Sequence, residues 1–492
     1  MAYVVDMRTV MVAPVDVDGR PGGPARIVSA GADFAVDPAW SPDGRWLVWH
    51  EWDVPAMAWD QSRIRMAPAD GRGSPLTVAG GPGVSVQQPR FSPDGSRLGY
   101  VSDAGGWANL WVADASGGGA RPLVEEAWEH AGPTWGCGQR SWAWSPDGSA
   151  VVFDRNEAGF GRLCVVDVGS GRVRALSRGV HTYLSWAGGR VGAVRSGART
   201  PTTVVTLDAA DGGRTVVARG PVGGFEAAGL VEPELVEWHS FEGATLHGRL
   251  YRPVARPDGS PPPLVLRVHG GPTDQHRVVF DPTAALLVDR GFAVLVADFR
   301  GSTGWGRSYT QALQGGWGAV DVDDLAAGLV AAAERGWGDA RRLAVMGSSS
   351  GGMAVLLLMA RHPELCAAGV ALYPVSDLAA LAATTHRLEA HYTWSLVGPP
   401  AEAAETYRQR SPLTVADAIR GPLLVLHGSA DEVVAAGQSV ALVARVREHG
   451  GMVEHHEYQG EGHGWRRPGT AADALGRIEA FLLAHTRGAM DR

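Results

Sequence analysis

The chain has 492 residues, of which 45% are hydrophobic and 20% charged, and a formal net charge of −8. This length exceeds what a single hydrophobic core usually organises, so we expect a soluble globular protein with two domains. The acidic balance and the lack of a basic cluster argue against a nucleic-acid partner. No segment approaches the roughly 18 uninterrupted apolar residues of a membrane span, so no membrane partner is expected.

The three cysteines, Cys137, Cys164 and Cys366, are odd in number and far apart. This pattern favours reduced, packed thiols over a disulfide framework. The N-terminus lacks the charged-then-apolar order of a signal peptide. We therefore expect a cytoplasmic protein.

A five-residue motif recurs three times in the first half of the chain. Trp/Phe-Ser-Pro-Asp-Gly occupies 40–44, 91–95 and 144–148, a spacing of about 50 residues that is typical of propeller blades. Each copy predicts a tight turn, because Pro sets the first turn angle, Asp bonds its own backbone and Gly accepts a positive φ. An apolar strand follows each turn, and a weaker copy runs from 184 to 208.

Residues 1–225 are therefore predicted to form a β-propeller in which each blade is a four-stranded sheet. Chance turns in a β-sandwich would not share both the spacing and the pattern that follows. At roughly 45–50 residues per blade the segment supplies only about four to five blades, so the propeller is short or incomplete. A small propeller, a longer ancestor that lost its leading blades, and a start codon placed too late all remain open.

A Gly/Ala-rich linker at 220–230 leads into the second predicted domain, residues 226–492. From 264 onward, short apolar strands alternate with helical segments, which predicts a mostly parallel sheet with helices on both faces. The expected strands are 264–268, 293–297, 343–346, 368–373, 423–426 and 453–458, the expected helices are 284–288 and 325–333, and an antiparallel entry spans 235–251 with a turn at Glu242-Gly243. Catalytic groups in such sheets lie at the carboxyl ends of the strands.

The motif Gly-x-Ser-x-Gly, with Ser349 at its centre, joins the strand at 343–346 to a Leu-rich helix. In a tight strand-to-helix turn, Gly347 and Gly351 avoid clashes and leave the Ser349 hydroxyl exposed at the top of the sheet. The helix that follows directs its N-terminus at this point and favours negative charge there. Taken alone, the pattern could equally be a Ser/Gly-rich loop, so a base, an acid and an oxyanion hole must also be found.

The loop after the strand at 423–426 contains Asp431, where a carboxylate that orients a catalytic imidazole belongs. Glu432 is a neighbouring competitor, but the shorter Asp side chain holds its geometry more rigidly. His427 stands at the end of the strand itself and is expected to be structural.

His463 lies between two glycines on the loop after the last predicted strand. The order Ser349, Asp431, His463 is that of an α/β-hydrolase triad. His455 and His456 are rivals, but in a strand they point to opposite faces and look like ordinary half-exposed residues. Because His463 must be neutral to act as a base, activity is expected to fall at acidic pH.

An oxyanion hole needs backbone N–H groups aimed at the developing negative charge. The amide of Ser350 follows the nucleophile directly and is one candidate. The other comes from His-Gly-Gly-Pro at 269–272, where Gly271 is the first choice and Gly270 the second. This tetrapeptide could be a plain turn, but its position after an early strand of the sheet favours the functional interpretation.

The glycines at 301–306 are spaced G-x-x-G-x-G, which is not the dinucleotide fingerprint. We interpret this segment as a structural loop, with Asp298 and Arg300 buried and paired. The sequence contains no phosphate-binding loop and no His-Glu-x-x-His motif. No metal and no cofactor are expected.

These motifs together resemble the prolyl oligopeptidase family of serine peptidases, over nearly the whole chain. The residues at 347–352, 426–431 and 461–464 stand where family members carry their triad. His-Gly-Gly-Pro at 269–272 resembles the acylaminoacyl-peptidase branch, which completes its oxyanion hole with backbone amides instead of a tyrosine hydroxyl. The segment 298–307 resembles the family's Arg-Gly-Ser-Thr-Gly loop.

The resemblance implies a propeller that covers the active site and admits only small peptides, although relatives have seven or eight blades. It also implies a substrate pocket built from the segment after the serine helix, which here contains Tyr373, Tyr392 and Trp394. Ala435 replaces a proline that is common in the family. No Glu-Glu pair could be assigned to capture of a substrate's free amino group.

The sequence therefore predicts a serine peptidase that hydrolyses amide bonds of short peptides or acyl-peptides through an acyl-enzyme, in the manner of an acylaminoacyl-peptidase or aminopeptidase. One alternative uses the same triad in an esterase or in a biosynthetic acyl transferase or cyclase. Another is a propeller-based binding protein with an inert hydrolase domain. The substrate side chain, the choice of exo- or endo-cleavage, and a homo-oligomeric state are left open.

Overall fold

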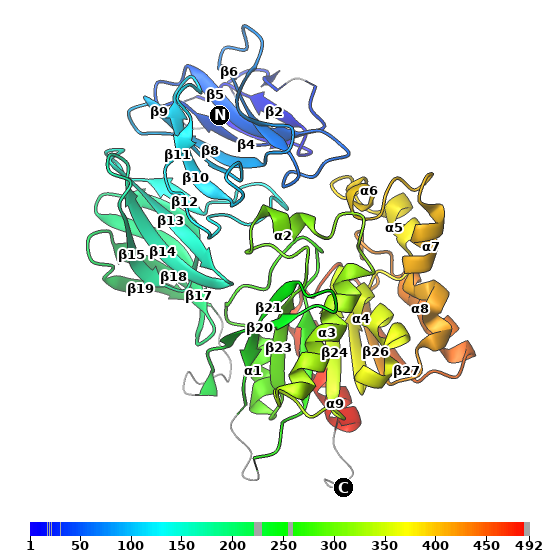
Figure 1. Cartoon of the computed structure of the whole chain (residues 1–492). Helices are drawn as coiled ribbons and strands as arrows, with labels where there is room; N and C mark the ends of the chain where they lie inside the picture. The colour runs from blue at the N-terminus through cyan, green and yellow to red at the C-terminus, as the bar shows by residue number, and fades with distance from the viewer. Residues whose placement is uncertain are drawn as a thin grey trace. The chain divides into compact units, whose positions relative to one another are not determined.

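The computed structural model describes residues 1–16, 18, 20, 22–29, 31–220, 229–253 and 259–486, and Figure 1 shows its course. These residues form two compact units. The first contains the described residues up to 220 and the short later segments 277–280 and 304–308, and the second contains the remainder. The predicted domain boundary at 225/226 lies outside the described residues, as does most of the predicted linker.

The first unit consists of antiparallel sheets that follow one another along the chain (Figure 1). Within the described residues, four of these sheets are four-stranded and one is three-stranded, which confirms the prediction of a propeller with four to five blades. The sheets are β1(Ala2–Val5), β2(Thr9–Val12), β3(Arg26–Ile27); β4(Phe34–Trp40), β5(Trp46–Trp52), β6(Ser62–Pro68), β7(Leu76–Gly81); β8(Val86–Phe91), β9(Arg97–Ser102), β10(Asn109–Asp114), β11(Arg121–Pro122); β12(Trp142–Trp144), β13(Ala150–Glu157), β14(Phe160–Asp167), β15(Val173–Arg178); and β16(Val180–Ala187), β17(Arg190–Gly197), β18(Thr200–Asp208), β19(Arg214–Arg219).

The repeated pentamer forms the same hydrogen-bonded turn in three blades. In the second copy, the Ser92 hydroxyl donates to Asp94 over 2.5 Å and accepts the Arg97 N–H over 3.0 Å. Gly95 closes the turn at a φ of 73° by donating to the Ser92 carbonyl. The serines of the other two copies, Ser41 and Ser145, are buried in the same way and bond the aspartate two residues later.

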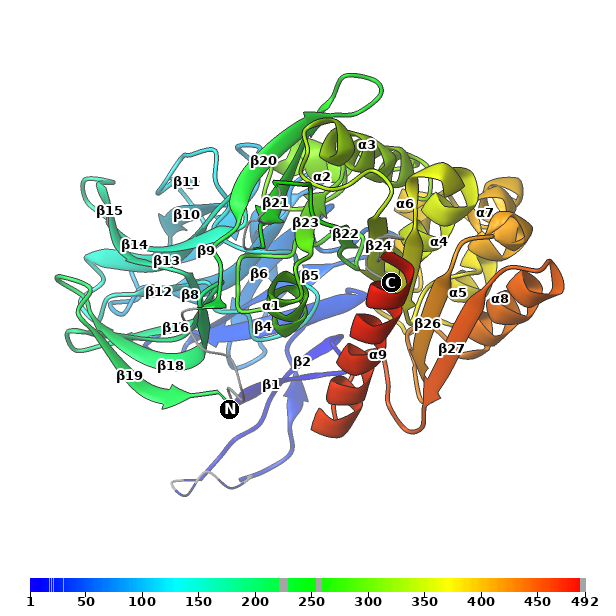
Figure 2. The ribbon, with the colours of Figure 1, turned by 90° about the horizontal axis from the view of Figure 1, so that it is seen from below.

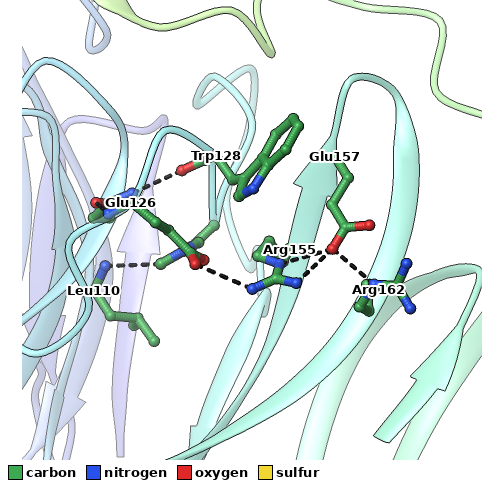
Figure 3. Close-up of polar contacts among 8 residues, drawn as sticks. Leu110, Glu126, Trp128, Arg155, Glu157 and Arg162 are labelled. Carbon is green, nitrogen blue, oxygen red and sulfur yellow. Dashed lines mark hydrogen bonds and ion pairs between the residues drawn. The ribbon is translucent and has the colours of Figure 1, made fainter. Parts of the chain in front are cut away.

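Half-buried polar side chains tie strands of the β12–β15 sheet to the loop that precedes it (Figure 3). Glu126 uses one carboxylate oxygen for the His130 ring, 2.8 Å away, and the other for Arg155, 3.0 Å away. Arg155 also contacts Glu157, which Arg162 reaches over 2.7 Å. Burial opposes ionisation of Glu157, but the two guanidinium groups outweigh it and lower its pKa. Both oxygens of Glu126 are thus engaged within this network.

The second unit is built on one eight-stranded sheet in the order β20-β21-β23-β22-β24-β25-β26-β27. β20 pairs with β21, and β21 with β23, in antiparallel orientation. The pairings from β23–β22 through to β26–β27 are parallel. The strands are β20(Glu234–His239), β21(Thr245–Tyr251), β22(Leu264–Val268), β23(Ala293–Asp298), β24(Leu343–Ser348), β25(Ala368–Leu372), β26(Leu423–Gly428) and β27(Val453–Tyr458). The predicted turn at Glu242-Gly243 joins β20 and β21, where Gly243 donates to the Ser240 carbonyl.

Helices cover both faces of this sheet, with α3 and α4 on one side and α1 and α9 on the other (Figure 2). The inner strands β22 to β26 are almost wholly buried, as their continuous apolar sequences require for a parallel sheet. The helices are α1(Pro282–Asp289), α2(Arg307–Gln311), α3(Val320–Glu334), α4(Ser350–Arg361), α5(Leu378–Thr384), α6(Tyr392–Leu396), α7(Ala404–Arg410), α8(Gly437–Glu448) and α9(Pro468–Thr486), with 3-10 turns η2(Pro363–Leu365) and η3(Pro412–Ala418). Among the described residues, none of these helices combines the length and apolarity needed to cross a bilayer.

Replacing a pentamer serine tests how much these turns stabilise the first unit. We expect Ser92→Ala to lower the free energy of unfolding by about 1 kcal/mol, because the Arg97 N–H loses the acceptor that the buried Ser92 hydroxyl supplies. Urea unfolding followed by tryptophan fluorescence measures the change. Ser74→Ala, at an exposed position of the same unit, is the control and should stay within about 0.5 kcal/mol of the parent. Equal stability of the two variants would contradict the prediction.

Candidate active site

The three motifs predicted to carry chemistry meet at one edge of the eight-stranded sheet. The parallel register aligns the carboxyl ends of neighbouring strands, pairing Val268 with Gly347, Ser348 with Leu372, and Leu372 with Leu426. The loops that leave β22, β24 and β26 therefore start from the same level. This alignment brings together segments that lie up to about 160 residues apart in the sequence.

Ser349 stands in a sharp turn between β24 and α4, as the Gly-x-Ser-x-Gly motif predicted. Its backbone has φ 56° and ψ −120°, a strained conformation for a residue with a side chain. Its N–H donates to the Leu372 carbonyl over 3.0 Å, and its carbonyl accepts from Met353 in the first turn of α4. The strand on one side and the helix on the other hold the serine in this conformation.

The glycines of the motif allow backbone contacts that no side chain would permit. A Cβ on Gly351 would lie 2.5 Å from the carbonyl oxygen of His269 and 2.6 Å from that of Val268. A Cβ on Gly347 would lie 2.3 Å from the carbonyl oxygen of Gly351. The start of α4 is therefore packed directly on the end of β22, where the predicted oxyanion loop begins.

Asp431 and His463 form a hydrogen-bonded pair on the neighbouring loops. The Nδ1 atom of His463 lies 2.7 Å from Oδ2 of Asp431, and the Asp431 side chain is fully buried. Burial opposes ionisation of Asp431, but hydrogen bonds from His427, His463 and the Val434 amide outweigh it and hold the pKa of this carboxyl well below its usual range. The carboxylate can thus fix the imidazole orientation and stabilise a positive charge on it.

Tyr373 connects this pair to the serine turn. Its ring centroid lies 4.6 Å from that of His463, and it follows Leu372, whose carbonyl accepts the Ser349 N–H over 3.0 Å. Burial raises the pKa of Tyr373, so the phenol remains a neutral hydrogen-bonding group. The end of β25 therefore contacts both the serine turn and the imidazole predicted to act with it. Glu432, the alternative to Asp431, is exposed. His455 and His456, the alternatives to His463, lie on β27, and neither takes part in the Asp431–His463 hydrogen bond.

The loop after β22 passes next to the serine. A Cβ on Gly270 would lie 3.4 Å from Cβ of Ser349, whereas Gly271 adopts a φ of 119° and turns against Thr273. On the other side of the serine, Ser350 is buried as the first residue of α4. The backbone of this loop and that of Ser350 thus lie on either side of Ser349.

The three residues predicted to line a substrate pocket have different surroundings. Tyr373 contacts His463, as described. Tyr392 is buried, and its hydroxyl accepts the Thr273 N–H over 3.0 Å and bonds the Thr273 hydroxyl over 2.6 Å. The ring of Trp394 packs on His391, with 4.8 Å between centroids. Tyr392 therefore supports the loop that carries Gly271, a contact between residues 119 positions apart that no local pattern announces.

A buried layer lies beneath the loop that follows β22. His269 stacks on Phe299 at 4.5 Å, and its Nε2 is 2.7 Å from the Ser302 hydroxyl. Burial lowers the pKa of His269, so this ring is neutral and structural.

The expectation that Asp298 and Arg300 pair with each other is wrong. Asp298 bonds Arg249 over 2.7 Å, and both side chains are buried. Arg300 instead reaches Asp324, also over 2.7 Å. Asp298 is the last residue of β23, whereas Arg300 lies two positions beyond the strand, so their side chains meet different partners.

The described residues contain no group of three or more His, Cys, Asp or Glu side chains arranged to hold a metal ion. The polar groups at this edge of the sheet are a serine, an imidazole, a carboxylate and backbone amides. Such a set is suited to nucleophilic attack on a carbonyl carbon with proton transfer through the imidazole.

Comparisons with known proteins agree with this geometry. The family model described as "Prolyl oligopeptidase family" matches residues 278–489. The solved structure of a puromycin-hydrolyzing peptidase from Mycobacterium tuberculosis superposes with a TM-score of 0.91 at 32% identity, covering 98% of this chain and 75% of that one. The chain belongs to the prolyl oligopeptidase family.

Curated relatives from this family match shorter stretches. Dipeptidyl aminopeptidase BIII of Pseudoxanthomonas mexicana is 35% identical over 269 residues, which is 52% of this chain and 39% of the relative. The acylamino-acid-releasing enzyme of Arabidopsis thaliana is 29% identical over 238 residues, 46% of this chain and 31% of the relative. The matches thus span less than half the length of these relatives.

Removing the Tyr392 hydroxyl tests its support of the oxyanion loop. We expect Tyr392→Phe to lower kcat for a peptide anilide about tenfold with a smaller change in KM, because a loosened oxyanion donor costs less than the ~100-fold or more of a deleted one. Tyr407→Phe is the matched control, since this buried hydroxyl bonds Thr393 and Gly398 instead. Identical kcat values for the two variants would contradict the prediction.

Proposed function

We propose that the chain is a serine peptidase that hydrolyses amide bonds of short peptides through an acyl-enzyme. Ser349 is the nucleophile, His463 the general base and Asp431 the residue that orients the imidazole. The observation that carries this proposal is the Asp431–His463 hydrogen bond of 2.7 Å, at the same edge of the sheet as the strained turn that holds Ser349 at φ 56°. Membership of the prolyl oligopeptidase family supports the same assignment.

In the first step, the Ser349 hydroxyl attacks the scissile carbonyl while Nε2 of His463 removes its proton. The amides of Ser350 and Gly271, or Gly270 in its place, donate to the oxyanion of the tetrahedral intermediate. His463 then gives the proton to the leaving amine, and the acyl-enzyme forms. Water, activated by the same imidazole, releases the acid product and restores the serine.

The proposed substrates are short peptides from which N-terminal residues, acylated or free, are removed. Two named relatives support this choice, one a dipeptidyl aminopeptidase and the other an acylamino-acid-releasing enzyme. The puromycin-hydrolyzing relative adds puromycin as a further substrate to test. We also propose a cytoplasmic location, which the three free cysteines support.

A fluorophosphonate probe tests the nucleophile directly. We expect the full chain to be labelled and the adduct to map to Ser349 rather than to the adjacent Ser348 or Ser350. Ser349→Ala should abolish labelling, because it removes the only hydroxyl that the imidazole activates, while Ser74→Ala should label like the parent. A folded parent that is never labelled would instead favour a binding protein with an inert hydrolase domain.

The substrate class is read from products. Acyl-peptide anilides, aminoacyl anilides, puromycin and simple esters are incubated with the parent and with Ser349→Ala, and the products are identified by mass spectrometry. We expect amide cleavage of the first two classes by the parent alone. Turnover of esters without any amide cleavage would contradict the peptidase assignment and indicate an esterase.

The loss of activity at acidic pH distinguishes protonation of His463 from protonation of Asp431. Burial opposes ionisation of Asp431, but hydrogen bonds from His427, His463 and the Val434 amide lower its pKa, so this carboxylate stays charged in the pH range in which imidazoles take up a proton. The loss of kcat/KM on acidification should therefore follow a single proton, taken up by His463, with about a tenfold fall per pH unit below the midpoint. A limb of slope two, or activity that persists on acidification, would contradict the assignment.

A further inference from the structure

His427 ends strand β26 and is completely buried next to the proposed triad. Its Nδ1 lies 2.7 Å from the hydroxyl of Ser439 on α8, and its Nε2 lies 2.9 Å from the carbonyl oxygen of Val434. The same Nε2 is 3.3 Å from Oδ2 of Asp431. The ring is thus clamped between a helix and the loop that carries the proposed catalytic carboxylate.

These contacts determine which nitrogen of His427 carries the proton. A carbonyl oxygen can only accept, so Nε2 must carry the hydrogen that faces Val434. In the neutral ring, Nδ1 then accepts the hydroxyl proton of Ser439. The Nε2–H group consequently faces both the Val434 carbonyl and the Asp431 carboxylate.

The carboxylate of Asp431 is held from four directions. Its Oδ1 accepts the N–H groups of Val433 and Val434, each over 2.9 Å. Its Oδ2 lies between two imidazoles, with His463 at 2.7 Å and His427 at 3.3 Å. His427 therefore contacts the very oxygen that orients the proposed base.

We propose that His427 is a positioning residue for the reaction, whose Nε2–H group fixes Oδ2 of Asp431 and limits the negative charge that this oxygen presents to His463. This inference deepens the proposed peptidase function and rests on it. A positioned carboxylate keeps the imidazole in the tautomer and orientation that the serine requires. Sharing of Oδ2 between two donors makes the Asp431–His463 bond weaker than it would be with His463 alone.

Other titratable groups face the same cluster. Strand β27 brings His455, whose pKa burial lowers, with Glu457 opposing and His427 adding to the effect. From the end of β25 comes Tyr373, whose pKa burial raises, with a contribution from the charge of Asp431. Helix α8 contributes the uncharged Ser439. Variants at position 427 leave all of these groups in place.

A pair of near-isosteric variants separates positioning from mere packing. In His427→Gln the side-chain amide reaches the place of Nε2 and can still donate to Val434 and Asp431. In His427→Asn the amide reaches only the place of Nδ1, so the contact with Ser439 survives and the contact with Asp431 is lost. Both variants change the buried volume in the same direction.

The measurements are steady-state kinetics on a peptide anilide and the titration of His463 by NMR of the full chain labelled with ¹⁵N-histidine. We expect His427→Asn to lower kcat about tenfold or more with little change in KM, since small misplacements of catalytic groups cost up to ~100-fold. We also expect its His463 to titrate at a higher pH than in the parent. His427→Gln should stay close to the parent in both readouts.

Indistinguishable His463 titrations in the Asn and Gln variants would overturn the proposal, and so would a shift to lower pH in His427→Asn. If neither variant folds, the ¹⁵N shifts of the parent decide. They should show the His427 proton on Nε2, and a proton on Nδ1 of the neutral ring would overturn the proposal.

The NMR readout also distinguishes this proposal from the peptidase assignment. It follows the Asp431–His463 pair without any turnover and can be recorded on Ser349→Ala. A parent that never labels with fluorophosphonate would contradict the peptidase function. A His463 titration that still differs between His427→Asn and His427→Gln would nevertheless support the contact between His427 and Asp431.

Discussion

The close approach between the start of α4 and the end of β22 is the constraint on which the site depends. Gly351 lies so near the carbonyl oxygens of Val268 and His269 that no side chain fits there. This contact keeps Ser349 in a strained backbone conformation that would relax in an unrestrained chain. The same contact determines how far the Gly270–Gly271 loop stands from the serine. The nucleophile and the proposed oxyanion donors are therefore positioned by one packing interaction rather than by two independent loops.

A second layer of contacts holds the flexible parts of the site. Loops after the strands carry Asp431, His463 and the glycines proposed for the oxyanion hole, and side chains outside these loops contact them. Tyr392 on α6 bonds Thr273, and Tyr373 at the end of β25 packs on His463. Side chains with their own fixed partners can hold a catalytic group more closely than a bare loop can.

Carboxylates in this protein are held in two ways. Some form ion pairs inside the fold, as the buried Asp298 does with Arg249 and the half-buried Glu157 does with Arg155 and Arg162. Others collect several hydrogen-bond donors, as Asp431 does with two amides and two imidazoles. A carboxylate of the second kind keeps its charge without a permanent cation beside it, so it remains available to a positive charge that forms only during a reaction.

The sequence determined the features that depend on local chemistry. The Ser-Pro-Asp-Gly pentamers predicted the turns because Ser, Pro, Asp and Gly act within five residues. A continuous apolar run predicted the strand 264–268 and an alternating segment predicted the strand 453–458, with the bounds that β22 and β27 show. Gly347, Ser349 and Gly351 predicted the strained turn for the same reason. Only the tertiary structure decided the partners of buried side chains. Asp298 pairs with Arg249 instead of Arg300, Tyr392 supports Thr273, and His427 meets Asp431, because strand register and helix packing bring distant residues together and no local pattern encodes that choice.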